Sequence, residues 1–209
     1  EDLGAGDVTT EACVPADAMA VGHGVARKAM IACGIPVAER VFRTVDPNLK
    51  FTAKVAEGAP VAAGTILYTV EGRARSLLTA ERVSLNLIQR MCGIATATRR
   101  YVDAIPTGSK TRITDTRKTT PGLRLLERYA VRRGGGHNHR NDLGSAVLIK
   151  DNHIVAAGGV KQAITAAKAR APHTSKIECE IDSLDQLEEA LTAGADIILL
   201  DNMDTATTA

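Results

Sequence analysis

The sequence has few aromatic residues and no tryptophan, and these absences narrow the ligands it can bind. Phe, Tyr and Trp together make up 2% of its 209 residues. Single-stranded nucleic acids are held largely by base stacking on aromatic side chains, so a broad surface of that kind is disfavoured. A net charge of +2 is also too small for a protein that binds polyanions over its whole surface. We therefore expect no nucleic-acid partner.

Long hydrophobic runs and cysteine motifs are missing as well. No apolar run approaches the roughly 18 residues that a membrane-spanning helix needs, and we expect no signal peptide. The four cysteines lie far apart and form no C-x-x-C pair. Unpaired thiols are typical of a reducing compartment. These features predict a cytoplasmic protein with no membrane partner, large enough for one big domain or two smaller ones.

Charge is distributed unevenly along the chain. The segment from residue 110 to 140 carries nine Lys and Arg, opposed only by Asp115 and Glu127, whereas the segment from Lys176 onward carries nine Asp and Glu. Such runs arise either from solvated helix faces or from a polyanion site with a cationic wall. The position of the charges on the secondary structure decides between the two.

The second half alternates between strand-like and helix-like segments. The apolar or β-branched segments 112–116, 146–150, 176–181 and 195–201 predict strands. Segments 121–133, 159–171 and 183–194 predict helices, the last with a capping box at Ser183 and Gln186 and Gly194 past its end. This alternation predicts right-handed βαβ units and a parallel sheet, either open or closed into a barrel.

Each of these predicted strands ends in charged residues, namely Asp115, Lys150, Glu180 and Asp201. The carboxyl ends of parallel strands meet at one rim, where active sites of α/β proteins are assembled. Helix-face charges would be scattered instead. The pattern therefore favours one charged cleft formed by residues 115–118, 139–150, Glu180 and Asp201.

The first half predicts a different, mixed α+β module. Segments 21–34, 49–58 and 64–72 show strand-like alternation, and 35–45 predicts a short helix. A long helix over 79–105 joins the halves, and we expect Gly93 to break it at the domain boundary. The domains are accordingly predicted as 1–91, including the linking helix, and 92–209.

Six segments, taken together, resemble one enzyme family. They are EDLGAGDVTT, LTAERVSLNLIQRMCGIATATR, ITDTRKTTPGLR, AVRRGGGHNHRNDL, LIKDNHI and ECEIDSLDQLEEALTAGADIILLDNM. In this order they are similar to quinolinate phosphoribosyltransferase, also called nicotinate-nucleotide pyrophosphorylase (carboxylating). The resemblance implies an N-terminal α/β sandwich followed by an incomplete α/β barrel of parallel strands. Family members continue beyond LLDNM, so we expect further βα units in the complete barrel.

The resemblance also implies a reaction in NAD biosynthesis. Quinolinate and phosphoribosyl pyrophosphate, with Mg²⁺ as cofactor, give nicotinate mononucleotide, pyrophosphate and CO₂. The implied assembly is at least a homodimer in which Arg82 enters the neighbouring subunit's site. The residues implied to bind substrate are Arg82, Thr116, Arg117, Lys118, His139, Arg140, Lys150, Glu180 and Asp201.

The chemistry explains why these residue types are needed. A dicarboxylate beside a polyphosphate demands forked, permanently charged arginines, and compact lysines suit phosphate oxygens. Lys118, Glu180 and Asp201 are the implied catalytic residues. Glu180 and Asp201 would hold Mg²⁺, directly or through water, and stabilise positive charge at the ribose. Glu178, two residues from Glu180, would lie on the same strand face.

The loop GGGHNHR, residues 134–140, fits the same scheme. Its glycines end a helix and let the backbone turn back toward the strand rim, where Asn138, His139 and Arg140 reach the anion. His137 and His139 are too weak a pair to predict zinc. Two alternatives stay open. One is a related phosphoribosyltransferase acting on another acid, either nicotinate phosphoribosyltransferase or the paralogue found in molybdate-transport gene clusters, and the other is a non-catalytic anion-binding relative.

Overall fold

The computed structural model describes residues 2–208, which form two compact units that divide between His139 and Arg140. Each unit has its own hydrophobic core. We call residues up to His139 the first unit and residues from Arg140 the second unit. Within residues 2–208 no helix has both the length and the apolar composition needed to cross a bilayer.

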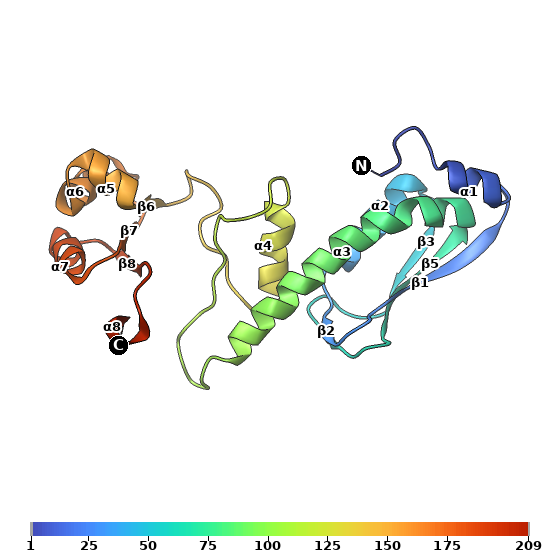
Figure 1. Ribbon diagram of the computed structural model, residues 1–209, viewed down its shortest axis with the longest axis horizontal. Coiled ribbons are helices and arrows are strands. Elements are labelled where there is room, and N and C mark those ends of the chain that lie inside the picture. The colour runs from blue at the N-terminus through green and yellow to red at the C-terminus, as the bar shows by residue number, and fades with distance from the viewer. Residues whose placement is uncertain (1, 209) are drawn as a thin grey trace. The chain divides into compact units, whose positions relative to one another are not determined.

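The first unit is built on a small antiparallel sheet in the order β1–β5–β3, with helices against it (Figure 1). Its strands are β1 (Met19–Val25), β3 (Lys50–Ala53) and β5 (Ile66–Arg73), with a separate short pair, β2 (Met30–Ile31) and β4 (Pro60–Val61). The helices are α1 (Val8–Cys13), α2 (Ile35–Val45), α3 (Ala74–Asp103) and α4 (Arg124–Arg133). This arrangement is the mixed α+β module predicted for the first half, although β1, β2 and β3 are shorter than the predicted segments.

The core of the first unit uses most of the chain's few aromatic side chains. Phe51 and Tyr68 stack with ring centroids 4.8 Å apart, and Phe42 of α2 lies 6.1 Å from each. Phe42 and Tyr68 are buried among aliphatic residues of the sheet and of α3. The scarce aromatic rings therefore stabilise this core by packing helix α2 on the sheet.

Helix α3 runs unbroken through Gly93, so the predicted break at that residue is wrong. One glycine costs a helix only about 1 kcal/mol, and the buried stripe that includes Ala80, Ile88 and Ala95 offsets it. The predicted domain boundary at 91/92 rested on that break and stays a prediction.

The sequence pattern predicts a strand over 112–116, but the structure has none there. The segment makes a single parallel bridge, Thr114 to His137, supported by backbone bonds from His137 N to Ile113 O and from Asp115 N to His137 O. Helix α4 then begins at Arg124, later than predicted, because Pro121 and Gly122 form a turn in which Gly122 has φ +79°.

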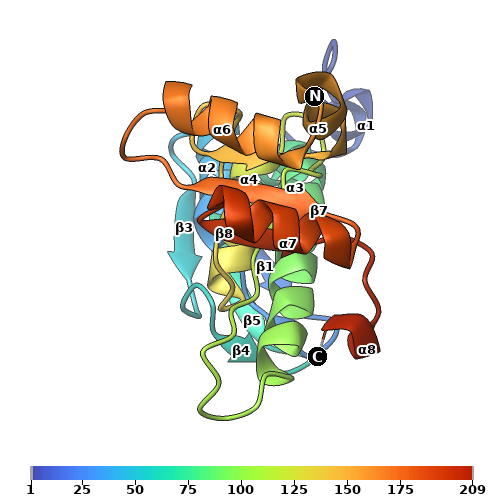
Figure 2. The same ribbon diagram turned by 90° about the vertical axis from the view of Figure 1, so that its left-hand side faces the viewer.

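The second unit is a parallel sheet in the order β6–β7–β8, formed by Val147–Ile149, Ile177–Ile181 and Ile197–Leu200. Figure 2 shows α6 and α7 flanking these strands. Its helices are α5 (Asp151–Ala157), α6 (Val160–Arg170), α7 (Leu184–Ala193) and α8 (Thr205–Thr208). The predicted parallel α/β organisation is thereby confirmed, and α5 is a helix that the sequence pattern had not predicted.

The predicted ends of helix α7 are confirmed in detail. The Ser183 hydroxyl accepts a hydrogen bond from the Gln186 amide at 3.4 Å, and Gly194 closes the helix with φ +79°. In a full capping box the Gln186 side chain would accept from the Ser183 amide. Here it accepts from the amide of Asp182 instead, which is a small departure. Local sequence therefore sets where helix α7 begins and ends between strands β7 and β8.

Glycines 134–136 end helix α4 against helix α3. Gly135 has φ +91°, which favours glycine, while a Cβ on Gly134 would lie 2.4 Å from the Ala95 carbonyl oxygen and one on Gly136 2.8 Å from Thr98 Cγ2. The loop after α4 is thus set by close backbone approach as well as by backbone freedom.

We predict that Gly134→Ala lowers the free energy of unfolding by about 1–3 kcal/mol, since the new methyl group meets backbone that cannot move aside. Urea unfolding followed by circular dichroism measures the change. Gly144→Ala is the matched control, because its Cβ would be no closer than 3.6 Å to a neighbour. Equal stability of the two variants would contradict the packing argument.

Candidate active site

The loop Asn138–His139 is anchored in the first unit by the carboxylate of Asp115. This side chain is 6% exposed and accepts from the His139 amide at 2.7 Å and from Asn138 Nδ2 at 2.6 Å. Arg128 Nη1 of helix α4 lies 3.3 Å from each of its oxygens. The Asp115 carboxylate is therefore buried and paired, and its predicted place in one charged cleft stays a prediction.

The basic residues that follow Asp115 are arranged differently. Thr116 Oγ1 accepts from the Lys118 amide at 3.1 Å, which folds residues 116–118 into a tight turn. The Lys118 side chain is exposed, and its ammonium has no hydrogen-bond or ion-pair partner within residues 2–208. The Nε of Arg117 is buried and likewise has no partner there. These two cations are available for an anion from outside the chain.

The second acid of the basic segment, Glu127, is also used internally. Its side chain is 11% exposed and accepts from Arg90 of helix α3, with Nε–Oε1 at 2.8 Å, and from the Thr120 amide at 3.3 Å. Burial raises the pKa of Glu127, but the hydrogen bonds from Arg90 and Thr120 and the charge of Arg90 outweigh it and hold the pKa below its ordinary value. Glu127 thereby ties α3, α4 and the turn at Thr120 together.

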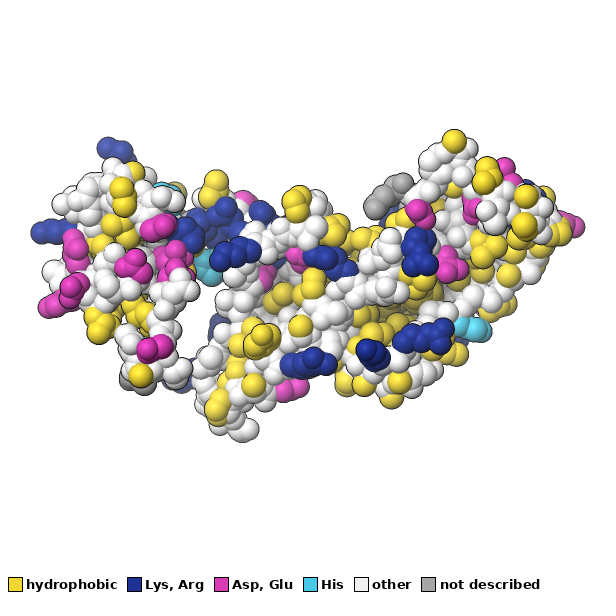
Figure 3. Space-filling view, viewed as in Figure 1, with side chains coloured by type: hydrophobic (Ala, Val, Ile, Leu, Met, Phe, Trp, Pro, Cys, Tyr) yellow, Lys and Arg dark blue, Asp and Glu magenta, His cyan; other side chains and the backbone are white. Residues whose placement is uncertain are grey.

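The second unit gathers a separate set of predicted residues on one face of its sheet. In the strand register, Leu148 pairs with Glu178 and Glu180 pairs with Leu199, so Lys150, Glu178, Glu180 and Asp201 share one side by alternation. The opposite side carries Ile149, Cys179 and Ile181, which are buried against α6 and α7. Figure 3 shows acidic side chains (magenta) gathered over this unit.

Lys150 and Glu180 are in direct contact on that face. Lys150 Nζ donates to Glu180 Oε2 at 2.7 Å, with the lysine side chain 39% and the glutamate side chain 14% exposed. The Lys150 amide donates to His153 Nδ1 at 3.0 Å, which fixes the start of helix α5 directly after the strand. Asp201 follows β8 and is exposed, and its amide donates to Ile181 O at 2.9 Å.

Arg140 is held at the beginning of the second unit. Its Nη1 donates to the Ala146 carbonyl at 3.0 Å, across a loop that Asp142 closes by accepting from Ser145 Oγ and Gly144 N. Arg140 also lines a cavity of about 610 Å³, whose other lining residues include Leu143 and Ala166 but not Lys150, Glu180 or Asp201. The gathering of all the predicted residues around one hollow stays a prediction.

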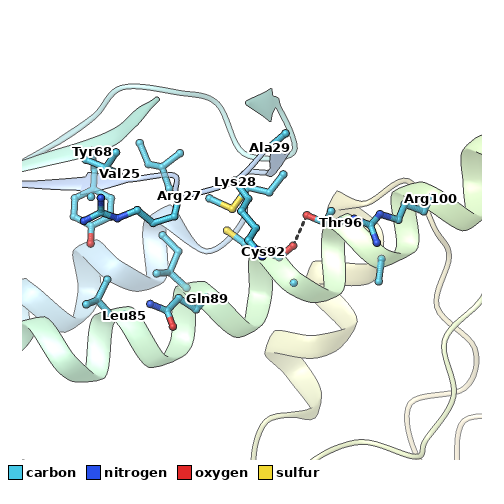
Figure 4. Close-up of a pocket in the computed structure, with 16 residues that line it drawn as sticks. Val25, Arg27, Lys28, Ala29, Tyr68, Leu85, Gln89, Cys92, Thr96 and Arg100 are labelled. Carbon is cyan, nitrogen blue, oxygen red and sulfur yellow. Dashed lines mark hydrogen bonds between the residues drawn. The ribbon is translucent and has the colours of Figure 1, made fainter. Parts of the chain in front are cut away.

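A separate groove in the first unit lies along helix α3, between it and the strands β1, β2 and β5 (Figure 4). It encloses about 580 Å³, with apolar residues such as Tyr68 and Leu85 on its walls and Arg27, Lys28 and Arg100 among its cations. Arg82 lies one turn before Leu85 and is exposed. Arg82 is therefore an exposed cation one helical turn from a residue that lines this apolar groove.

The carboxylates of the second unit have the oxygen donors that a hard cation such as Mg²⁺ requires, but they are too few to hold it alone. Glu180 and Asp201 offer oxygen ligands on one sheet face, which is the donor type that Mg²⁺ takes. Glu180 is also bonded to Lys150, and no group of three or more His, Cys, Asp or Glu side chains within residues 2–208 is placed to hold a metal. The residues fit an ion that is completed by substrate and water oxygens.

Sequence reasoning missed the residues that hold the site residues in place. Arg128 was counted only among the nine basic residues of the segment 110–140, and Arg90 was not singled out. Glu127 was noted only as an opposing charge, and Asp115 only as an opposing charge and a strand-end residue. The signal was present, since these were the two acids in a segment with nine basic residues. Buried acids in such a segment are expected to pair.

The fold and these residues together indicate a general class of protein. Free cations after a bridge between residues 113–115 and 137, and a lysine with carboxylates at the ends of parallel strands, are typical of an α/β enzyme acting on anionic substrates. The chain matches the family model "Quinolinate phosphoribosyl transferase, N-terminal domain" over residues 7–92 and the corresponding C-terminal domain over residues 94–209. The chain belongs to the quinolinate phosphoribosyltransferase family.

Individual relatives agree with this assignment. A nicotinate-nucleotide pyrophosphorylase [carboxylating] from Mycobacterium leprae is 48% identical over 205 residues, covering 97% of this chain and 72% of the relative. A probable enzyme of the same name from Synechocystis is 44% identical over 209 residues, covering 100% and 70%. The crystal structure of NadC from Streptococcus pyogenes superposes with a TM-score of 0.91 at 42% identity, covering 99% of this chain and 73% of that one.

We predict that Glu127→Gln lowers the free energy of unfolding by about 1.5 kcal/mol at neutral pH, since it removes a charged acceptor from Arg90. Because the folded-state pKa of Glu127 is lowered, its contribution is full above the unfolded value of about 4.3 and is lost as pH falls through the folded value.

Urea unfolding of both proteins between pH 3 and 8 measures this difference. The two stability curves are expected to converge at the acid end. A difference that persists unchanged at the lowest pH would show that the carboxylate charge is not its cause.

Proposed function

We propose that this protein transfers a phosphoribosyl group from phosphoribosyl pyrophosphate to quinolinate, giving nicotinate mononucleotide, pyrophosphate and CO₂ in NAD biosynthesis. The observation that carries the proposal is the pair Arg117 and Lys118, two cations without a partner within residues 2–208. The named relatives supply the reaction. An arginine nitrogen buried without a partner favours binding of an anion, because an anion compensates its lost hydration.

The residues of this chain act by binding and positioning. Arg117, His139 and Arg140 hold the carboxylates of quinolinate, and Lys118 and Lys150 hold phosphate oxygens. The pyridine nitrogen attacks the anomeric carbon as the bond to pyrophosphate breaks, so no protein nucleophile is needed. The positively charged ring then accepts the electron pair released when CO₂ leaves the adjacent carbon.

Glu180 and Asp201 serve the ribose side of the reaction. Positive charge that develops at the anomeric carbon is stabilised by a nearby carboxylate. Mg²⁺ would be held by these two carboxylates together with substrate and water oxygens, and it would neutralise the pyrophosphate charge. Substrate phosphates that bind Lys150 would also release Glu180 from the 2.7 Å ion pair.

The assembly we propose is a homodimer with shared sites. The groove along α3 has apolar walls, and the exposed side chains of Leu78 and Arg82 continue it toward the start of the helix. A second copy packed there would cover the groove and receive Arg82 in its own site. The four cysteines are free thiols, which supports a reducing compartment, the cytoplasm.

We predict that the purified protein with phosphoribosyl pyrophosphate and Mg²⁺ releases CO₂ and forms the mononucleotide from quinolinate. Lys118→Ala and Glu180→Ala should each lower turnover at least about a hundredfold, as when one electrostatic group is removed from an active site. Labelled CO₂ and chromatography of the mononucleotide measure the reaction, and circular dichroism checks folding.

Lys110→Ala and Glu188→Ala are matched controls, since both residues are exposed and lack a role in the proposed site. They should retain full turnover. Mononucleotide formed from nicotinate instead of quinolinate would assign the related phosphoribosyltransferase. Substrate binding without turnover of either acid would assign a non-catalytic relative.

We predict that subunits carrying Arg82→Ala complement subunits carrying Lys118→Ala. In a randomly mixed dimer population, about a quarter of the sites would receive an intact Lys118 and an intact partner arginine. Turnover of the mixture, compared with each variant alone, measures this recovery. A mixture no more active than its components would rule out the shared site.

A further inference from the structure

Asp115 is an acidic residue close to residues that are proposed to bind anionic substrates, where a negative charge disfavours binding. It lies two residues before Arg117, three before Lys118, and it contacts the amide of His139. All three of those residues are proposed to bind anions. A carboxylate so close to a dianion weakens binding by like-charge repulsion unless it does something that outweighs the cost.

The contacts of Asp115 show what it does. It neutralises Arg128 and accepts from Asn138 and from the His139 amide, so its charge is compensated inside the first unit. Its side chain is 6% exposed and that of Arg128 is 14% exposed. The carboxylate is therefore directed away from solvent and toward the loop.

We propose that Asp115 is a positioning residue that fixes the loop Asn138–His139 relative to the turn Thr116–Lys118. The inference rests on the proposed function, in which these two segments bind the same dicarboxylate substrate. Asp115 does not touch substrate in this scheme. It acts through the His139 amide and through Asn138.

The backbone explains why one carboxylate is enough. Residues 113–115 and 137 run side by side through the bonds His137 N to Ile113 O, at 2.8 Å, and Asp115 N to His137 O, at 3.0 Å. The backbone pairing ends there, and residues 116–118 form a tight turn in which Thr116 Oγ1 accepts from the Lys118 amide. The Asp115 side chain continues the connection where backbone pairing stops.

Asn138 extends this connection to helix α4. Its Nδ2 donates to Asp115 Oδ2 at 2.6 Å and to the Arg128 carbonyl at 3.0 Å. Asp115, Asn138 and Arg128 thus form a closed set of contacts among the bridge, the loop and the helix. A displacement of the loop by 1 Å breaks several of these bonds at once, and displacements of that size are costly for catalysis.

The test replaces Asp115 by Asn, which keeps the shape and one acceptor but loses the charge and the second acceptor. Asp115→Asn is expected to raise the KM for quinolinate about tenfold or more while kcat changes less than about threefold, because binding geometry is lost and the reacting groups are kept. The affinity for quinolinate alone, measured by calorimetry, should fall in parallel. The KM for phosphoribosyl pyrophosphate should stay within about twofold.

A double-mutant cycle tests the geometry directly. Asn138→Ala removes the donor to Asp115 and to the Arg128 carbonyl, and it is expected to raise the KM for quinolinate by itself. Because both side chains act through the same contacts, Asp115→Asn with Asn138→Ala is expected to raise the KM no more than about threefold beyond Asp115→Asn alone. Asp103→Asn is the control, because within residues 2–208 this exposed acid pairs only with Arg99.

A lowered melting temperature with an unchanged KM, or fully additive effects of the two substitutions on KM, would overturn the inference. If Asp115→Asn does not fold, Asn138→Ala decides, since it removes the loop contact and leaves Asp115 paired with Arg128. An unchanged KM in that variant would also overturn it. A parent protein that neither binds nor converts quinolinate would refute the proposed function itself, and the positioning role with it.

Discussion

The pairing of two buried carboxylates determines which cations of the basic segment remain free. Asp115 takes Arg128 and Glu127 takes Arg90, and both acids also accept backbone hydrogen bonds from the turns nearby. The charges paired in this way stabilise the fold and are not available to a ligand. Arg117 and Lys118, which have no ion-pair partner within residues 2–208, keep their charge for the proposed ligand. The anion binding that we propose for the first unit depends on this division of partners.

The second unit separates charge from core by a simpler rule, the alternation of side chains along strands. Cys179 and Ile181 are buried against the helices, while Glu178, Glu180 and Lys150 share the other face. Burial raises the pKa of the Cys179 thiol, with the charges of Glu180 and Glu189 adding to it, so that this thiol stays neutral and apolar in character. One strand thus serves the core and the proposed site at the same time.

Patterns that depend on near neighbours were predicted well. Helix α2 spans Ile35–Val45 as expected, and β6, β7, β8 and α7 lie within a few residues of the predicted segments. The failures have a common origin. Segment 112–116 has β-branched residues but forms only one bridge, and Gly93 does not break α3, because in both cases distant residues decide the outcome. Helix α5 is a failure of another kind, because its start involves a local bond, from the Lys150 amide to His153 Nδ1, that the pattern of apolar residues does not reveal.

The sequence by itself determined the family, through the order of several motifs, and the residue types that the chemistry of a dicarboxylate and a polyphosphate requires. It also determined the parallel βα pattern of the second unit, since strand alternation and helix caps are local properties. Only the tertiary structure decided that Asp115 is buried and paired, that Lys150 contacts Glu180, and that Arg117 keeps a buried nitrogen with no partner among the described residues. Pairing between charges depends on distances between segments far apart in the chain, and those distances are set by packing.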